Sequence, residues 1–292
     1  MTTPHQDADP AMMAPGKSPR QPLSPLVIFG LLVVGLVVIA AVVSFFWTPF
    51  SPISTDLKNR SVGPFVGGHW LGTDRTGRDT ATRLMLGSQT TLYVGLVAVG
   101  IAAVIGTPLG ILAGMVRPGF SEFLMRTNDI LLAFPALLLA LILAAKYGGS
   151  VTTAMVAIGI ASIPGFVRVL RSATMQVMGT DYVKAARVAG RRGGAIAVRH
   201  ILPNVAGLII VQASSAYAIA ILAEAALSFL GLGAPASVPS WGRMLYEGQS
   251  TMTVDPMVSV WPGLAIAVAV LGFNLLGDGL RDRFDPRMAA KR

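Results

Sequence analysis

Long apolar stretches separated by short polar segments occupy most of the chain. The hydrocarbon core of a bilayer is about 30 Å thick, and about 20 apolar helical residues cross it. Six stretches reach this length, two of them interrupted by charged side chains: Leu26–Trp47, Thr91–Val116, Glu122–Ala145, Tyr147–Val167, Pro203–Gly231 and Pro256–Gly277. The pattern therefore predicts an all-α integral membrane protein with six transmembrane helices.

The polar segments divide the chain into regions. The first apolar stretch is longer than a typical signal peptide core and no Ala-x-Ala cleavage site follows it, so we interpret it as a retained anchor. The residues before it are rich in proline and poor in large apolar side chains, which predicts disorder. The predicted regions are a cytoplasmic tail (1–25), a first helix (26–47), an external segment (48–87), a five-helix core (88–280) that contains a long loop (168–204), and a second cytoplasmic tail (281–292).

Composition narrows the class of protein further. Hydrophobic residues make up 53% of the 292 residues and charged residues 13%, and the mean hydropathy is +0.65. Soluble domains carry about 25% charged residues, so this composition excludes an ordinary soluble enzyme. The chain has no cysteine, and its three histidines, His5, His69 and His200, are far apart. We therefore expect no metal site and nominate no catalytic residue.

The basic residues predict the orientation. If both ends of the chain are cytoplasmic, 16 of the 23 Lys and Arg residues lie on the inner side and seven on the outer side. An excess of basic residues in cytoplasmic loops is the rule for membrane proteins. The formal charge of +9 therefore indicates membrane topology, and we expect no nucleic-acid partner.

A short helix is predicted within the long inner loop, over Asp181–Gly190. Thr180 or Asp181 can cap its start, and Gly190 can end it. One face carries small residues and a tyrosine at i, i+3, i+4 and i+7 spacing: Tyr182, Ala185, Ala186 and Ala189. A narrow face of this kind suits close docking against a protein, but the basic residues around it also suit a helix lying on anionic lipid. The pattern alone leaves both interpretations open.

The same loop resembles a known motif. Lys184-Ala185-Ala186 is followed after three residues by Gly190, and after nine more by His200-Ile201-Leu202-Pro203. This spacing is similar to the Glu-Ala-Ala-x3-Gly-x9-Ile-x-Leu-Pro loop of ABC importer permeases, with Lys184 in place of Glu and His200 in place of Ile. The resemblance implies that the loop couples the permease to a cytoplasmic ATPase through Asp181, Tyr182, Lys184, Ala185, Ala186, Ala189, Gly190, Leu202 and Pro203.

A second motif resembles the dipeptide/oligopeptide (peptide/nickel) class of these permeases, in the shorter of the two subunits. It runs from His69 to Asp79, and Phe134-Pro135 and Leu230–Gly233 also resemble that class. The candidate residues are His69, Gly72, Asp74, Gly77, Arg78 and Asp79. Their charges can neutralise one another while the glycines form tight turns. Alternatively, they contact the substrate or a binding protein directly.

Three charged residues within the predicted spans are further candidates, because charges in a membrane are costly. Arg126 and Asp129 are three residues apart and can pair on one helix face near the inner end, either structurally or as part of a pathway. Glu224 lies near the outer end of its span. We expect it to face protein or water, with exposure to lipid headgroups as the alternative.

The resemblance also implies a function and an assembly. The fold would be the type I ABC importer transmembrane fold, in a bacterial inner membrane. The chain would pair with a homologous permease, two ATPase subunits and an extracytoplasmic binding protein to import di- or oligopeptides. The Gly-x-x-x-x-Gly-Lys-Ser/Thr loop is absent from the sequence, so ATP and Mg²⁺ would bind in the partner subunits. The alternatives are a stand-alone secondary transporter, for which we find no obvious repeat, and a membrane-embedded hydrolase.

Overall fold

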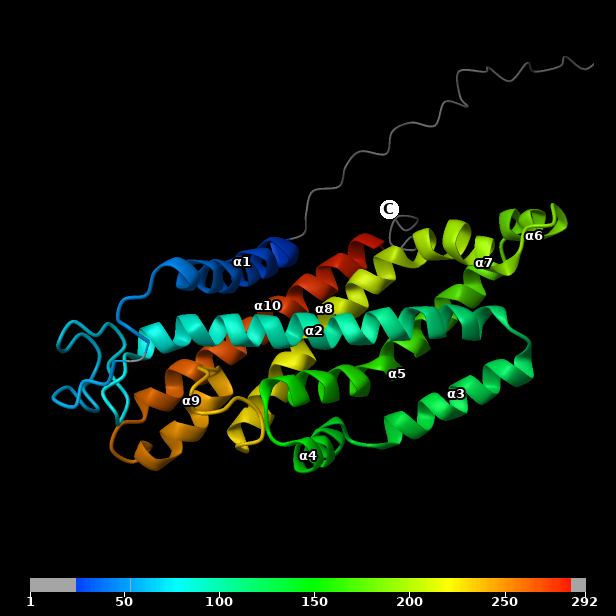
Figure 1. Cartoon of the computed structure of the whole chain (residues 1–292). Coiled ribbons are helices and arrows are strands. Elements are labelled where there is room, and N and C mark those ends of the chain that lie inside the picture. Colours follow the sequence, from blue (N-terminus) through cyan, green and yellow to red (C-terminus); the bar gives the residue numbers. More distant parts are fainter. Residues whose placement is uncertain (1–24, 53, 285–292) are drawn as a thin grey trace, which may run out of the picture.

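The computed structural model describes residues 25–52 and 54–284, which form a bundle of helices joined by loops (Figure 1). The long helices are α1 (Pro25–Phe46), α2 (Thr80–Met115), α5 (Val151–Met178), α8 (Leu202–Phe229) and α10 (Met257–Phe284). The shorter ones are α3 (Pro118–Ala133), α4 (Ala136–Tyr147), α6 (Asp181–Val188), α7 (Gly193–Ile196) and α9 (Trp241–Gly248), with a π-helical turn η2 (Ala197–Ile201) and a 3-10 turn η3 (Gln249–Thr251).

Five of the described helical stretches are long and apolar enough to cross a membrane, and the α3–α4 pair makes a sixth if it is one span. α3 and α4 meet at an angle of 76° around Phe134-Pro135. Proline lacks the N–H of a regular helix and restrains the residue before it, so the helix breaks there. The predicted third span is therefore a broken pair and not one straight helix.

Small residues bring the central helices close together. Gly106, Gly110 and Gly114 lie at four-residue intervals on the side of α2 that faces α5. A Cβ atom added at Gly106 would lie 2.6 Å from the Cβ of Phe166, and one at Gly110 would lie 2.7 Å from that of Leu170. Phe166 and Leu170 are fully buried. Small side chains allow helices to pack closely where lipid supplies no hydrophobic driving force.

The second packed layer joins α1, α8 and α10. A Cβ atom at Gly30 would lie 2.7 Å from the backbone nitrogen of Leu276, so α1 and α10 are in backbone contact. Tyr217 of α8 stacks on Phe273 of α10 with ring centroids 4.2 Å apart. α9 packs against both α8 and α10, and Trp241 and Met244 join the same buried cluster.

The helices extend beyond the spans that hydropathy predicts. α5 continues through Arg168 and Arg171 to Met178, and α2 begins at Thr80. The predicted loop 168–204 is therefore mostly helical, and the predicted external segment 48–87 gives way to helix at Thr80. A charged residue ends the apolar stretch but does not end the helix, because the side chain can extend into water while the backbone hydrogen bonds continue. Residues 1–24 and 285–292 of the two predicted tails lie outside the described residues.

Candidate functional site

Two polar regions lie at opposite ends of the bundle (Figure 1). One contains α6, between the end of α5 and the start of α8, and we call it the α6 end. The other contains residues 54–79 and α9, near the start of α2 and the end of α8, and we call it the α9 end. α1 begins and α10 ends toward the α6 end.

α6 is a short helix with a defined stop. Gly190 has φ +75°, a conformation that glycine adopts without strain. The N–H of Gly190 donates to the carbonyl of Arg187 (2.9 Å), and the N–H of Arg191 donates to that of Ala186 (3.1 Å). These two bonds form a Schellman motif, which confirms the predicted role of Gly190 as the residue that ends the helix. Thr180 precedes α6, but its hydroxyl donates to the carbonyl of Val177 (2.6 Å) and does not cap the helix.

The burial of α6 corrects the predicted docking face. Val183 is fully buried and Ala186 is 9% exposed, so this side of the helix packs on its own chain. Val188 is 90% exposed and Tyr182 45%, and Ala185 and Ala189 are also exposed. Successive residues on a helix are about 100° apart, which turns Ala186 inward while Ala185 points out. The exposed apolar face of α6 is therefore made of Tyr182, Ala185, Val188 and Ala189, and the charged Asp181, Lys184 and Arg187 are exposed beside it.

The remaining residues of the predicted coupling motif begin α8. Leu202 and Pro203 occupy its first turn, where proline costs no hydrogen bond. The π-helical turn η2 precedes them and carries His200, whose ring lies 6.0 Å from that of Tyr182, centroid to centroid. Lys184, at the position where the motif has Glu, makes an exposed ion pair with Asp181 (2.9 Å). The motif residues thus lie together at the α6 end.

At the other end of the bundle, segment 54–79 forms tight turns. Gly77 has φ +78°, and a Cβ atom there would collide with the carbonyl oxygen of Asp56. Only glycine allows this approach of two backbones. Gly72 also has a positive φ of 78° and lies against the carbonyl oxygen of Val62. The turns place the charged residues of the 69–79 motif next to the start of α2.

Asp74 is the centre of the charges within this segment. Its Oδ1 accepts hydrogen bonds from the backbone N–H groups of Thr76 (2.8 Å) and Arg78 (3.0 Å). Its Oδ2 accepts from Nε of Arg78 (2.8 Å) and Nη1 of Arg83 (2.7 Å). The side chains of Asp74 and Arg83 are each 5% exposed. Asp74 and Arg78 therefore neutralise one another, as the structural interpretation of the sequence predicts, and Arg83 of α2 joins them, whereas Arg75 takes no part in these pairs.

Glu247 of α9 extends this network to a distant part of the chain. It accepts hydrogen bonds from Nη2 of Arg83 (2.7 Å), Nη2 of Arg78 (2.8 Å) and Nε of Arg243 (3.0 Å). The side chain is 11% exposed. Glu247 and Arg243 are absent from the predicted site, and so is α9. The sequence does carry signals of α9, because Ser240 suits an N-cap and Trp241, Met244 and Gly248 follow at helical spacing. In the structure, the hydroxyl of Ser240 accepts from the N–H of Arg243 (3.1 Å), and those three residues are buried.

The network lowers the pKa of both of its carboxyl groups. Burial alone would raise the pKa of Glu247, but the charge and hydrogen bond of Arg83, together with Arg78 and Arg243, outweigh it. Burial likewise opposes the shift at Asp74, where hydrogen bonds from Thr76 and Arg78 and the charge of Arg83 lower the pKa. Opposite charges and hydrogen bonds favour the ionised form of a carboxyl group. Both carboxylates are therefore ionised over the neutral range of pH.

The other two motif residues fix the start of α2. Oδ2 of Asp79 accepts from the N–H of Thr82 (2.7 Å), which is an N-cap bond. Oδ1 of Asp79 lies 2.9 Å from Nδ1 of His69, and the imidazole of His69 stacks on Phe50 at 4.1 Å. Both side chains are almost fully buried. His69 and Asp79 therefore have a structural role, because they hold this segment against the start of α2.

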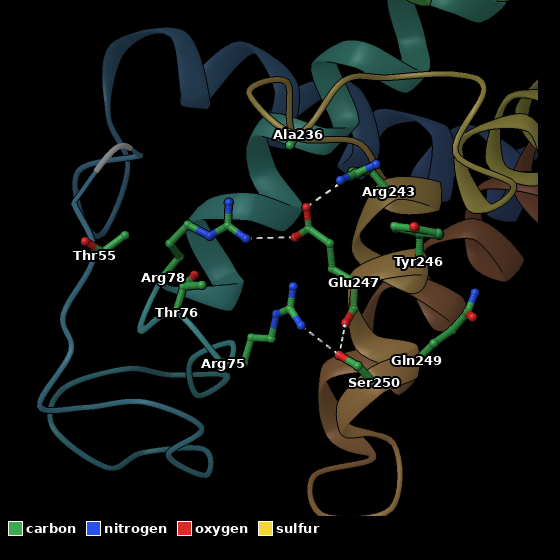
Figure 2. Close-up of a pocket in the computed structure, with 10 residues that line it drawn as sticks. All are labelled: Thr55, Arg75, Thr76, Arg78, Ala236, Arg243, Tyr246, Glu247, Gln249 and Ser250. Atoms are coloured by element: carbon green, nitrogen blue, oxygen red, sulfur yellow. Dashed lines mark hydrogen bonds and ion pairs between the residues drawn. The ribbon is translucent and has the colours of Figure 1, made fainter. Parts of the chain in front are cut away.

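A hollow of about 650 Å³ separates segment 54–79 from α9 (Figure 2). Its lining is polar and rich in arginine: Thr55, Arg75, Thr76, Arg78, Ala236, Arg243, Tyr246, Glu247, Gln249 and Ser250. Figure 2 shows Arg75 and Arg78 reaching across from the segment toward Ser250 and Glu247 of the opposite wall. Six of these residues are exposed, so the hollow opens on the protein surface: Thr55, Arg75, Ala236, Tyr246, Gln249 and Ser250.

The predicted pairing of Arg126 with Asp129 is wrong. Nη2 of Arg126 donates to Glu122 of the preceding turn (2.7 Å), and Asp129 accepts from Nη2 of Arg168 on α5 (2.9 Å). All four side chains are more than half exposed. An i, i+4 spacing suits the Glu122–Arg126 pair, and the closeness of α3 and α5 brings Arg168 within reach of Asp129.

Glu224 is 2% exposed, so it faces protein and not lipid. Its Oε1 accepts a hydrogen bond from the hydroxyl of Ser228 (2.7 Å). The hydroxyl of Ser228 in turn accepts from the N–H of Ala234 (3.0 Å), in the loop between α8 and α9. Glu224 therefore helps to hold the end of α8 against this loop.

The fold is that of an ABC importer permease. The chain aligns with a chain of the MetNI methionine ABC transporter, solved in inward facing conformations, with a TM-score of 0.59 and 18% sequence identity. The alignment covers 70% of this chain and 96% of that chain. Because the identity is low, the likeness establishes the fold and nothing beyond it.

Sequence comparison identifies the family. Residues 106–290 match the family described as "Binding-protein-dependent transport system inner membrane component". The dipeptide transport system permease protein DppC of Alkalihalophilus pseudofirmus is 41% identical over 263 residues, which cover 90% of this chain and 86% of DppC. The glutathione transport system permease protein GsiD of Pectobacterium atrosepticum is 40% identical over 259 residues, covering 87% and 86%. The chain belongs to this family of inner-membrane permeases, as its motifs predict, and it is not the ATPase.

Proposed function

We propose that this permease forms half of a translocation path and that α6 couples it to a cytoplasmic ATPase. The observation that carries the proposal is the exposed face of α6, made of Tyr182, Ala185, Val188 and Ala189, at one end of the bundle. Val188 is 90% exposed and lies beside Tyr182, Ala185 and Ala189, and a contiguous exposed apolar patch is typical of an interaction surface. The Schellman motif ends α6 at Gly190, and the ring of Tyr182 lies 6.0 Å from that of His200 in the turn before α8, centroid to centroid.

The other half of the path would come from a homologous permease, and two ATPase subunits would bind one α6 each. ATP and Mg²⁺ would be held by the ATPase subunits. This chain contributes no catalytic group, and its role is to change conformation when the ATPases close. The family is binding-protein-dependent, so a binding protein would deliver the substrate at the α9 end.

The proposed substrates are di- and oligopeptides. The relatives at about 40% identity are named for dipeptides and for glutathione, which is itself a tripeptide. The coverage of these relatives is nearly complete, so the likeness includes the 69–79 motif as well as the helical core.

The proposed orientation places the α6 end and both ends of the chain in the cytoplasm. The support comes from the sequence, because this orientation assigns 16 of the 23 Lys and Arg residues to the cytoplasmic side. Segment 54–79 and α9 would then face the outside.

Single-cysteine variants test both parts of the proposal, since the natural chain has no cysteine. Val188→Cys and Ala185→Cys should cross-link to an ATPase subunit in the assembled complex, because both positions are exposed. Val183→Cys is the matched control on the same helix, and it should not cross-link because Val183 is fully buried. In intact cells, Ser61→Cys should react with an impermeant thiol reagent and Arg192→Cys should not.

The results distinguish the two interpretations of α6. If Val188→Cys reacts with a lipid-soluble probe and never cross-links to an ATPase, α6 lies on the membrane surface and the coupling role is wrong. If Arg192→Cys reacts from outside and Ser61→Cys does not, the orientation is reversed.

A further inference from the structure

The hollow at the α9 end carries more positive than negative charge. Three arginines, Arg75, Arg78 and Arg243, line it, against one carboxylate, Glu247. When the neighbouring Asp74 and Arg83 are included, the cluster holds four arginines and two carboxylates, a net charge of +2. An open site with this balance attracts an anionic group.

Arg75 is the arginine of the hollow that has no carboxylate partner among the described residues. Its guanidinium is exposed and donates to the hydroxyl of Ser250 (3.2 Å), which is neutral. Among the described residues, no carboxylate lies within 4 Å of it, whereas Arg78, Arg83 and Arg243 each pair with one or two. A guanidinium group has five N–H donors in a planar fork that matches a carboxylate.

Arg243 lies on the α9 wall and is held in place on two sides. Its Nε donates to Oε1 of Glu247 (3.0 Å), and its guanidinium lies 4.7 Å from the ring centroid of Tyr246. The terminal nitrogens are not used in these contacts. A guanidinium that is already fixed loses little side-chain entropy when it binds, so the site is preorganised.

We propose that the hollow receives an acidic side chain of the extracytoplasmic binding protein, which forms ion pairs with Arg75 and Arg243. The inference rests on the proposed function, because it requires that the α9 end face outward and that a binding protein dock there. The hollow lies between segment 54–79 and α9 on the surface of that end, and its exposed rim suits a side chain projecting from a docked protein. Ion pairs at such a rim govern the rate and specificity of docking.

The test uses the complete transporter reconstituted in proteoliposomes with its binding protein. The quantity measured is the binding-protein concentration that gives half-maximal peptide uptake, at low and at physiological salt. Arg75→Gln should raise this concentration about three- to tenfold, and Arg75→Glu by more, since a like charge repels the partner. Arg75→Lys should restore most of the wild-type value. The effects should shrink as salt is raised, because exposed charges are screened.

The control is the double variant Lys58→Gln/Arg60→Gln. Both residues are exposed on the same segment outside the hollow, so the variant removes positive charge from that surface without altering the site. It should leave the half-maximal concentration within about twofold of wild type. An effect equal to that of Arg75→Glu would overturn the proposed site, because it would show that the binding protein is attracted by the positive charge of the whole surface.

An unchanged half-maximal concentration in Arg75→Glu would also overturn the inference. So would a selective loss of uptake of a dipeptide relative to its C-terminal amide at an unchanged binding-protein requirement, since the hollow would then bind the substrate carboxylate. If the wild-type complex shows no response to binding protein at all, the proposed function itself fails, and this inference fails with it.

Discussion

Replacing Glu247 with Gln tests whether the charge network holds segment 54–79 against α9. The variant keeps the shape of the side chain and one acceptor oxygen but removes the negative charge that faces Arg83, Arg78 and Arg243. Removing one partner of a buried ion pair costs about 3–5 kcal/mol. Arg83 is 5% exposed, whereas Arg78 is 23% exposed and water can partly replace its partner. We therefore expect the lower figure, about 3 kcal/mol.

Amide hydrogen exchange in nanodiscs measures this effect locally. Because a tenfold change corresponds to about 1.4 kcal/mol, amides in residues 72–83 should exchange about 100-fold faster in the variant. Those of α10 should be unchanged. Glu122→Gln is the control, because Glu122 is 63% exposed and its pair with Arg126 is solvated. If exchange over residues 72–83 rises less than about threefold, the network does not stabilise the segment and our reasoning from burial is wrong.

Three further predictions concern other parts of the molecule. The pKa values of Asp74 and Glu247 lie below their ordinary values of 3.8 and 4.5, so the stability they confer is present above those values. This stability should be lost progressively as the pH falls below the ordinary values and through the lower pKa values of the folded protein, and exchange over residues 72–83 should show the loss. Gly110→Val should lower the thermal stability of the purified chain by about 1–3 kcal/mol or more, since the added atoms meet α5; an unchanged melting temperature would contradict this packing. Glu224→Ala should cost about 1–3 kcal/mol, because Ser228 loses its buried acceptor, and wild-type stability and uptake would refute this role.

The positions of the spans could be predicted from the sequence, whereas the ends of the helices could not. Hydropathy reports where side chains avoid water, and each predicted span overlaps a helix or the α3–α4 pair. Where a helix continues beyond the apolar span into water, hydropathy marks the end of the span but not the end of the helix. At the α6 end, Nε of Arg171 donates to the hydroxyl of Ser121 (3.0 Å), a contact between α5 and α3 that helps to position this extension of α5.

The site at the α9 end was predictable only in part. Asp74 and Arg78 are four positions apart in one turn, and the sequence motif predicts that their charges neutralise one another. Glu247 lies 169 residues from Arg78 of the segment and 164 residues from Arg83 at the start of α2. No local pattern links residues so far apart, and the contact exists only because α9 returns to the start of α2.

The alanines of α6, Ala185, Ala186 and Ala189, show a different limit of what a sequence pattern can predict. Spacing places Ala185 and Ala186 on one broad face, but a helix of eight residues must use part of that face to pack on its own bundle. The structure resolves this competition in favour of Val183 and Ala186 on the inside. Substitution of Ala186 by a large or charged residue would therefore disturb the chain itself before it disturbed a partner. Val188 is the position at which docking can be tested without disturbing the fold.

One helix connects the two polar ends of the molecule. α8 follows α6 through α7 and η2, and it continues through a short loop into α9. Its 28 residues span about 42 Å as a helix. At its far end, Glu224, Ser228 and Ala234 join α8 to the loop that leads to α9, and α8 and α9 pack against each other. At its near end, the π-helical turn η2 is the irregular element, and such turns interrupt the regular helical hydrogen bonding. A displacement of α6 would thus be absorbed at η2 or passed along α8 to the α9 end, and the stiffness of η2 decides which occurs.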